Sequence, residues 1–182
     1  MKKLIFISFI LISAVSAYNQ TYITRNGNVS FYSRTPVENI KAENNEAVSV
    51  LNAATGEIEF KIAIKSFHFP KTAMEEHFND DDYMASAKFP KADFKGKIAS
   101  ISSVNLSKDG TYNILANGNL TIKDVTKSVS AQATINVKNG VVTAAANFNI
   151  QRKDYNVIGE SFVQKKIAEE IEISVNCQYD KQ

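Results

Sequence analysis

The sequence contains one cysteine, no tryptophan, two histidines, three prolines and seven glycines among its 182 residues. A single cysteine excludes a disulfide within the chain. Two histidines leave few options for acid–base catalysis. No stretch is rich in proline, glycine or serine, and no internal repeat is apparent, so we predict one domain without an internal linker.

The common catalytic and nucleotide-binding motifs are also missing. No glycine-rich phosphate loop follows a predicted strand, and no Gly-x-Ser-x-Gly nucleophile elbow is present. Cys177 lies on the apolar alternation of residues 171–179, far in sequence from His68 and His77, so a Cys/His pair is not expected. We predict a buried thiol, with a reactive thiol or a dimer disulfide as the less favoured alternative. The chain is therefore predicted not to be an enzyme, with no catalytic residue, metal or cofactor.

Long apolar runs are absent except at the N-terminus. Two lysines in residues 1–3 precede an apolar run from Leu4 to Ile12, and residues 15–17 present small side chains at both cleavage-recognition positions. These features predict a signal peptide, residues 1–17, with cleavage after Ala17. The apolar run is too short for a transmembrane helix, and no other stretch approaches its length. We therefore predict that the mature chain, residues 18–182, is exported to the periplasm or secreted and has no transmembrane segment.

Net charge offers no attraction for nucleic acid. The full chain has a formal charge of +2, and loss of Lys2 and Lys3 with the signal peptide brings it to 0. We therefore predict no nucleic-acid partner. The sequence makes no prediction of the oligomeric state.

Long alternations of apolar and polar residues occupy the second half of the chain. From Tyr112 to Ile122, from Val129 to Val137 and from Val142 to Ile150, every second residue belongs to one largely apolar face. Alanine and glycine occupy the middle of this face. Because protein interiors are close-packed, such a face needs a helix, a bulky neighbouring strand or a ligand to fill the space beside it. Of these three, we expect a ligand to fill the space.

Other segments predict further strands around these. The Asn26-Gly27 and Asn139-Gly140 pairs predict hairpin turns. Several strands are about ten residues long, and long antiparallel strands joined by tight turns tend to close into a barrel, which removes exposed edges. We predict an all-β fold, an antiparallel barrel of about eight strands that is wide enough for side chains or one small ligand. The other predicted strands are Thr21–Arg25, Val29–Ser33, Glu46–Leu51, Ile58–Phe69, Asp93–Ser102 and Lys165–Tyr179.

One segment interrupts the strand pattern. Pro70 suits the first turn of a helix, and Met74, His77 and Phe78 are spaced to share one helical face. Asn79 and the three aspartates that follow predict the end of that helix. We therefore predict a helical insertion near residues 70–85 that acts as a lid or plug of the barrel.

The candidate ligand-binding residues are apolar side chains predicted to face the barrel interior, small residues between them, and polar residues near its mouth. For any one large residue, packing against its neighbours is an equally good interpretation, whereas the small residues are harder to explain by packing. The predicted ligand-binding set is Phe60, Ile62, Phe67, Phe69, Met74, His77, Phe78, Ile114, Ala116, Leu120, Ile122, Ala133, Ala144, Phe148 and Arg152.

Two residues of this set have other interpretations. His77 has acidic neighbours in sequence, but the adjacent Glu75 and Glu76 point in different directions from a helix. A structural or ligand-contacting histidine is therefore favoured over a metal ligand or a catalytic acid–base group. His68 is predicted to be exposed. Arg152 follows a strand and offers a cation to a lipid phosphate or carboxylate, although an ordinary charged turn is the favoured interpretation.

Five blocks of the sequence are MEEHF (residues 74–78), DYM (82–84), KFPKADFKG (88–96), GNLTIKDVTK (118–127) and RKDY (152–155). In their order and spacing these blocks resemble the YceI-like family, over almost the whole mature chain. At Asn156 the chain departs from the family pattern, because many members have glycine there, but asparagine also tolerates a positive φ. The resemblance implies an extended, lipocalin-like antiparallel barrel with a helix and a long apolar cavity, which in characterised members holds polyisoprenoid or similar lipid chains.

The residues and the resemblance predict the same function. We expect an exported binding protein that holds an isoprenoid or fatty-acid-like long-chain lipid in an apolar barrel cavity. Each buried methylene contributes about 0.8 kcal/mol, so a tail of about ten carbons could reach micromolar affinity after the costs of association. The alternative is a non-enzymatic envelope stress or interaction protein whose barrel is filled by its own side chains and carries no ligand.

Overall fold

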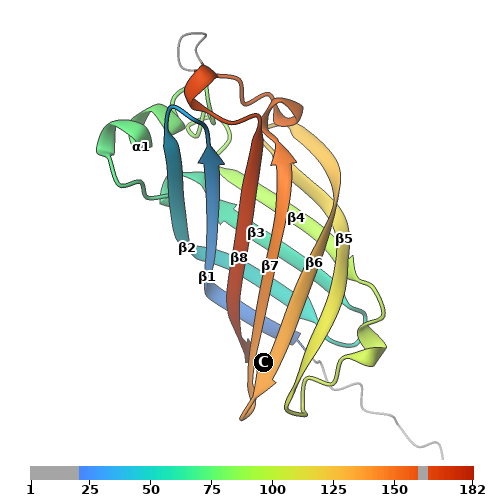
Figure 1. Ribbon diagram of the computed structural model, residues 1–182. Coiled ribbons are helices and arrows are strands. Elements are labelled where there is room, and N and C mark those ends of the chain that lie inside the picture. Colours follow the sequence, from blue (N-terminus) through green and yellow to red (C-terminus); the bar gives the residue numbers. More distant parts are fainter. Residues whose placement is uncertain (1–20, 160–163) are drawn as a thin grey trace, which may run out of the picture.

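Eight antiparallel strands form a closed barrel in chain order, and β1 pairs with β8 to close it (Figure 1). This architecture comes from a computed structural model that describes residues 21–159 and 164–182. The predicted signal peptide, residues 1–17, lies outside the described residues and stays a prediction. The barrel confirms the predicted fold class. Its strands are β1 (Thr21–Arg34), β2 (Asn39–Asn52), β3 (Glu57–Ala63), β4 (Lys91–Ile98), β5 (Gly110–Ile122), β6 (Val125–Lys138), β7 (Val141–Gln151) and β8 (Glu170–Lys181).

The predicted hairpin at Asn139-Gly140 is confirmed. Lys138 pairs with Val141, which leaves a two-residue loop between β6 and β7. Asn139 and Gly140 have φ angles of 52° and 79°. A two-residue loop with positive φ at both positions matches the right-handed twist of the strands that it joins.

The predicted turn at Asn26-Gly27 is wrong. β1 continues through these residues and pairs with β2 on both sides of them, with register shifts between Thr24 and Gly27 and between Gly27 and Val29. A Cβ atom on Gly27 would lie 2.9 Å from Cys177 Sγ. Glycine at residue 27 is therefore needed because Cys177 lies so close to a β-bulge, and the chain does not reverse here.

The helical insertion is confirmed, but its regular part is shorter than predicted. Helix α1 (Thr72–Asn79) lies beside one end of the barrel, in the connection between β3 and β4 (Figure 1). Asn79 Nδ2 donates a hydrogen bond to Glu75 O at 2.8 Å, and Asp80 has extended backbone. The chain then follows turns to Pro90. The strand predicted over residues 58–69 ends at Ala63, because Ile64–Ser66 form a 3₁₀ turn.

The barrel end opposite α1 is closed by a packed core. The short connection between β4 and β5 contributes Leu106 to this core, with Ile101 and Val104 packed against it. One polar pair lies within it: the hydroxyl groups of Ser49 and Tyr179, both buried, are 2.8 Å apart. The core residues are Tyr22, Leu51, Ile58, Ile98, Leu106, Ile135, Val137, Val142, Cys177 and Tyr179.

Cys177 is buried, as predicted, with 4% of its surface exposed. Burial raises the pKa of its thiol to about 11. Because only the thiolate reacts readily, we expect almost no reaction of the native protein with Ellman's reagent at about pH 8, and full reaction after denaturation. Rapid labelling of the native protein would contradict this placement of Cys177.

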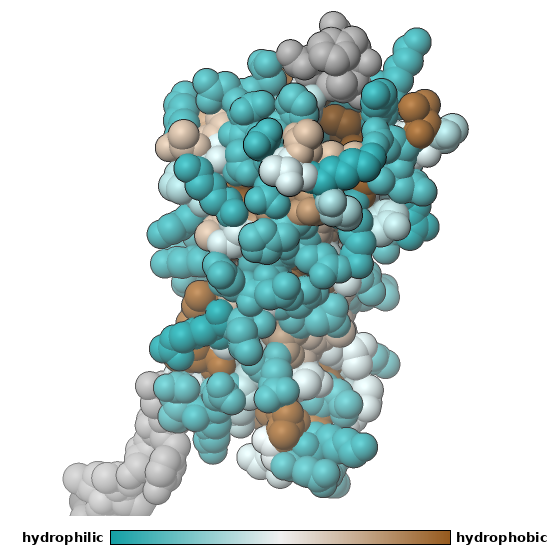
Figure 2. All heavy atoms as spheres, turned by 90° about the vertical axis from the view of Figure 1, so that its left-hand side faces the viewer, coloured by the Kyte–Doolittle hydropathy of each residue, from teal (hydrophilic) through white to brown (hydrophobic). Residues whose placement is uncertain are grey.

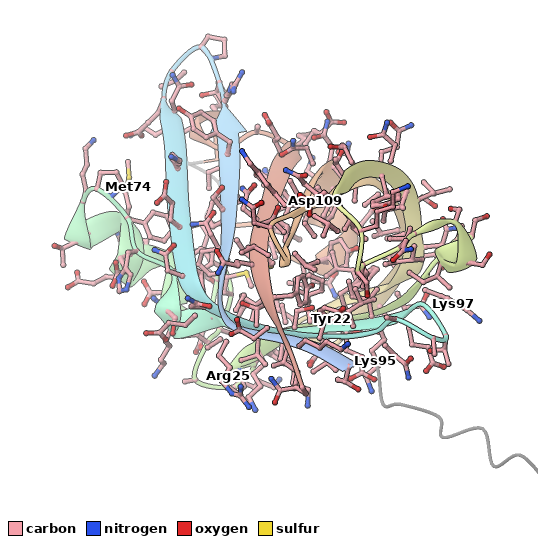
Figure 3. The ribbon with its side chains drawn as sticks, turned by 90° about the horizontal axis from the view of Figure 1, so that it is seen from below. Tyr22, Arg25, Met74, Lys95, Lys97 and Asp109 are labelled. Atoms are coloured by element: carbon pink, nitrogen blue, oxygen red, sulfur yellow. The ribbon has the colours of Figure 1, made fainter. Side chains whose placement is uncertain are left out.

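The outer surface of the barrel is largely polar. The face in Figure 2 is mostly hydrophilic, with small and separate hydrophobic patches. Viewed from the closed end, Lys95 and Lys97 of β4 project from the outside of the barrel, whereas Tyr22 lies toward its interior (Figure 3). Among the described residues, no helix is both long and apolar enough to cross a bilayer.

Candidate functional site: an apolar cavity inside the barrel

A cavity of about 540 Å³ lies inside the barrel, between the packed core and the end that carries α1. All eight strands contribute to its wall, and this volume is within the usual range for a small-molecule site. The wall is overwhelmingly apolar. Its acidic and basic side chains at the α1 end are those of Glu38, His77, Arg152 and Lys166. The cavity therefore has an apolar interior and a polar end.

A patch of alanines keeps the middle of the cavity open. Ala116 pairs with Ala131, and Ala133 pairs with Ala146, so these side chains share the inner face of β5, β6 and β7. Ala144 lies opposite Ile135 on the same face. All five alanines line the cavity. The small-residue face noted in the sequence is thus the wall of an open space.

Gly118 is the exception within this face. It pairs with Gly96, and a Cβ atom on either glycine would lie 2.6 Å from Phe94 Cζ. The Phe94 ring therefore covers both glycines and itself lines the cavity. At this position the bulky neighbouring strand fills the space, which is the alternative that the sequence left open.

Four phenylalanines form a cluster on the cavity wall near α1. Phe78 of α1 lies 5.5 Å from Phe31, 5.6 Å from Phe67 and 5.1 Å from Phe69, measured between ring centroids. All four rings line the cavity. Thus these residues both pack against one another and face the open space, so the two interpretations of the sequence are not exclusive.

The structure brings all fifteen predicted ligand-binding residues together on one cavity wall. That they contact a ligand stays a prediction. Phe31 also lines the cavity and was not predicted, although it lies on the alternation of Val29 and Ser33. Phe94 was not predicted either, because the role of its ring depends on the Gly96–Gly118 pairing. Further wall residues that were not predicted include Ile64, Tyr83, Met84, Ile150, Ile171 and Ile173.

The two histidines occupy different positions. His77 lines the polar end of the cavity from α1, its side chain is 66% exposed, and its Nδ1 lies 3.5 Å from Asp80 Oδ2. His68 is exposed, as predicted, with Nδ1 3.6 Å from Glu75 Oε2. Within residues 21–159 and 164–182, no group of three or more His, Cys, Asp or Glu residues is placed to hold a metal ion.

Arg152 lies in the turn that follows β7 (Arg152–Tyr155), and only 4% of its surface is exposed. Its Nε donates to Ala168 O at 3.0 Å, and its Nη1 donates to Val157 O at 2.9 Å and to Ile158 O at 2.6 Å. The guanidinium thus ties together the connection between β7 and β8. The favoured interpretation as an ordinary charged turn is wrong for Arg152, because burial and three carbonyl partners distinguish it from a solvated cation.

The neighbours of Arg152 complete this turn. Lys153 is exposed and pairs with Glu169, so it does fit a charged turn. Asn156 has a φ of 56°, which confirms that asparagine takes the positive φ expected at this position. Lys123 Nζ donates to Asn156 O at 3.1 Å and to Tyr83 O at 2.9 Å. One lysine therefore links the α1 segment and the turn after β7 at the same end of the barrel.

The sequence and the fold are similar to those of known proteins. Residues 20–179 match the YceI-like domain. No curated protein matches the sequence significantly. BcnA of Burkholderia cenocepacia has a TM-score of 0.69 and 20% identity, over 85% of this chain and 96% of that chain. The YCEI protein of Campylobacter jejuni has a TM-score of 0.61 and 18% identity, over 82% and 88%.

A third solved structure is described as a polyisoprenoid binding domain from Saccharophagus degradans that is implicated in plant cell wall breakdown. It has a TM-score of 0.77 and 11% identity, over 91% of this chain and 100% of that chain. At these identities the likeness shows a shared fold.

Proposed function

Because this chain belongs to the YceI-like family, we propose that it is an exported protein that binds an isoprenoid or other long-chain lipid inside its barrel. The observation that carries the proposal is the cavity of about 540 Å³ with its almost wholly apolar wall. An apolar chain that leaves water for such a space gains about 0.8 kcal/mol for each methylene that becomes buried. The polyisoprenoid-binding description of one structural neighbour supports the same class of ligand.

The cavity is suited to holding a molecule rather than to transforming it. His77 has only Asp80 as an ion-pair partner and is largely exposed, so no buried base lies beside a nucleophile on the described wall. Tyr179 is buried, and burial raises the pKa of its hydroxyl well above the usual range. It therefore remains a neutral hydroxyl group at physiological pH. We infer that the protein is a binder and not an enzyme.

Native mass spectrometry of the protein purified from its own cells tests both parts of this proposal. We expect an additional mass that organic extraction recovers as a long-chain lipid, and a polypeptide mass that lacks residues 1–17. Lipid-free protein that also fails to take up an offered isoprenoid would contradict lipid binding. A polypeptide that retains its first 17 residues after purification from the cell envelope would contradict export with cleavage after Ala17.

The alternative function assumed a barrel filled by its own side chains. The alanine patch on β5, β6 and β7 lines open space, and the aromatic rings of the wall surround that space without filling it. A filled barrel is therefore not what this sequence forms. No observation favours that second function over lipid binding.

A further inference from the structure

The barrel wall divides between β6 and β7. Pairing between these strands runs from the hairpin at Lys138 and Val141 up to Gln132 and Asn147, and stops there. Above this point β6 pairs only with β5, and β7 pairs only with β8. Figure 1 shows the two strands separating above the hairpin before the upper end of β6 curves back toward the turn that follows β7. Two strand edges, residues 125–131 and 148–151, thus face each other with no backbone bridge between them.

The side chains at this fork are unpaired amides. Gln132 and Asn147 are the last partners in the register, both are exposed, and neither makes a side-chain hydrogen bond within the described residues. Two hydroxyl groups near the fork are bonded instead. Ser130 Oγ donates to Asn117 Oδ1 at 2.6 Å, and Thr134 Oγ1 donates to Asn113 Oδ1 at 3.2 Å. Gln132 and Asn147 therefore leave amide donors and acceptors open to a ligand at the fork.

The fork borders the cavity. A shallow groove on the outer side of the barrel is lined by six residues from β6, β7 and β8, and one of them, Phe148, also lines the cavity. Phe148 therefore separates the apolar interior from the polar groove. The groove residues are Ser130, Gln132, Asn147, Phe148, Asn149 and Glu172.

We propose that this fork is the subsite for the polar end of the ligand, and that it selects long-chain lipids with a neutral, hydrogen-bonding head group such as an alcohol or a primary amide. The inference rests on the proposed lipid-binding function. The tail lies among the alanines of the cavity, and the chain passes Phe148 so that its head reaches Gln132, Asn147 and the unpaired strand edges. Amide side chains and backbone groups can both donate to and accept from such a head.

Charge explains the preference for a neutral head. The groove contains amides, one hydroxyl group and the carboxylate of Glu172, and it contains no cation. Arg34 Nη2 lies 3.6 Å from Glu172 Oε2, but Arg34 is not part of the groove. Because Arg34 is already paired with Glu172, the groove offers no unpaired cation to a carboxylate or phosphate head. Arg152 is not part of the groove either, and its Nε and Nη1 donate to the carbonyl groups of its own loop.

Competition binding with matched ligands tests the subsite. Oleyl alcohol, oleamide, oleate and the hydrocarbon octadecene would each displace the fluorescent hydrocarbon diphenylhexatriene from the purified protein at about pH 8, where the carboxylate is ionised. We expect the alcohol and the amide to bind about 10-fold more tightly than oleate, the effect of about one hydrogen bond. In the double variant Gln132→Leu, Asn147→Leu this advantage should disappear, with octadecene unchanged. The matched control is Asn136→Leu, an exposed amide lower on β6 where the strands are paired.

Three results would overturn the subsite. The first is oleate binding at least as tightly as the alcohol in the unmodified protein. The second is a double variant that keeps the preference for the alcohol, and the third is a Glu172→Gln variant that does not narrow the gap between alcohol and oleate. In each case binding of octadecene shows that the lipid-binding function itself holds. If none of the four compounds binds, the lipid-binding function fails, and the subsite fails with it.

Discussion

Replacing Ala133 or Ala144 with phenylalanine should abolish lipid uptake while the protein stays folded. Both alanines line the cavity, and Ala144 lies where its wall meets the packed core. A phenylalanine ring there would displace about four methylenes of a bound chain, at about 0.8 kcal/mol each. We therefore expect the dissociation constant for an isoprenoid to rise on the order of 100-fold. Titration with a fluorescent lipid measures this loss directly.

The control for this prediction places the same ring on the outside of the barrel. Asn136 is exposed and lies on the same strand as Ala133, so Asn136→Phe should leave lipid uptake unchanged. Circular dichroism should give the spectrum of an intact β-barrel for all three variants. Unchanged uptake in both Ala133→Phe and Ala144→Phe would show that these residues do not face the ligand.

Replacing Arg152 with leucine should cause a large loss of stability. Its Nε and Nη1 donate to three backbone carbonyls, and the side chain is almost wholly buried. Without these donors the free energy of unfolding should fall by about 3 kcal/mol, because buried acceptors are left unsatisfied. A loss of this size lowers the midpoint of thermal unfolding by about 10 °C in a domain of this length. Differential scanning calorimetry measures the change.

Two further variants separate geometry from charge at this position. Lysine at residue 152 keeps the charge but not the planar set of donors, so Arg152→Lys should remain destabilised. The neighbouring Lys153 pairs with Glu169 on the surface, and Lys153→Ala should therefore unfold close to the unmodified protein. A midpoint for Arg152→Leu that equals that of Lys153→Ala would contradict the role of Arg152 in holding this connection.

The fold was largely predictable from the sequence because its strands are long and strictly alternating. The alternation from Tyr112 to Ile122 predicts one apolar strand face, and β5 has that face. The positive φ angles at Asn139 and Gly140 follow from their residue types. The turn predicted at Asn26-Gly27 failed for a non-local reason. Gly27 is required by Cys177, which is 150 residues further along the chain and becomes its neighbour only when β8 pairs with β1.

The cavity was predictable in part. The residues that could not be predicted are those whose role depends on the register between neighbouring strands. Alternation places Ala116, Ala133 and Ala144 on an inner face, and this needs no knowledge of neighbouring strands. The position of Phe94 over Gly118 depends on the register between β4 and β5, which a single sequence does not contain. The same holds for the fork at Gln132, since the pattern of β6 does not reveal where its pairing with β7 stops.

The Phe94 ring has a consequence for the size of molecule that this barrel accepts. The ring covers Gly96 and Gly118, whose backbones lie close together. A Cβ atom on Gly118 would lie 2.5 Å from Lys95 O, so this position must stay glycine even without the ring. Neither glycine can therefore be enlarged to replace the ring. A shorter side chain at residue 94 would thus extend the cavity toward β4. This one substitution would let the same barrel accept bulkier or branched ligands.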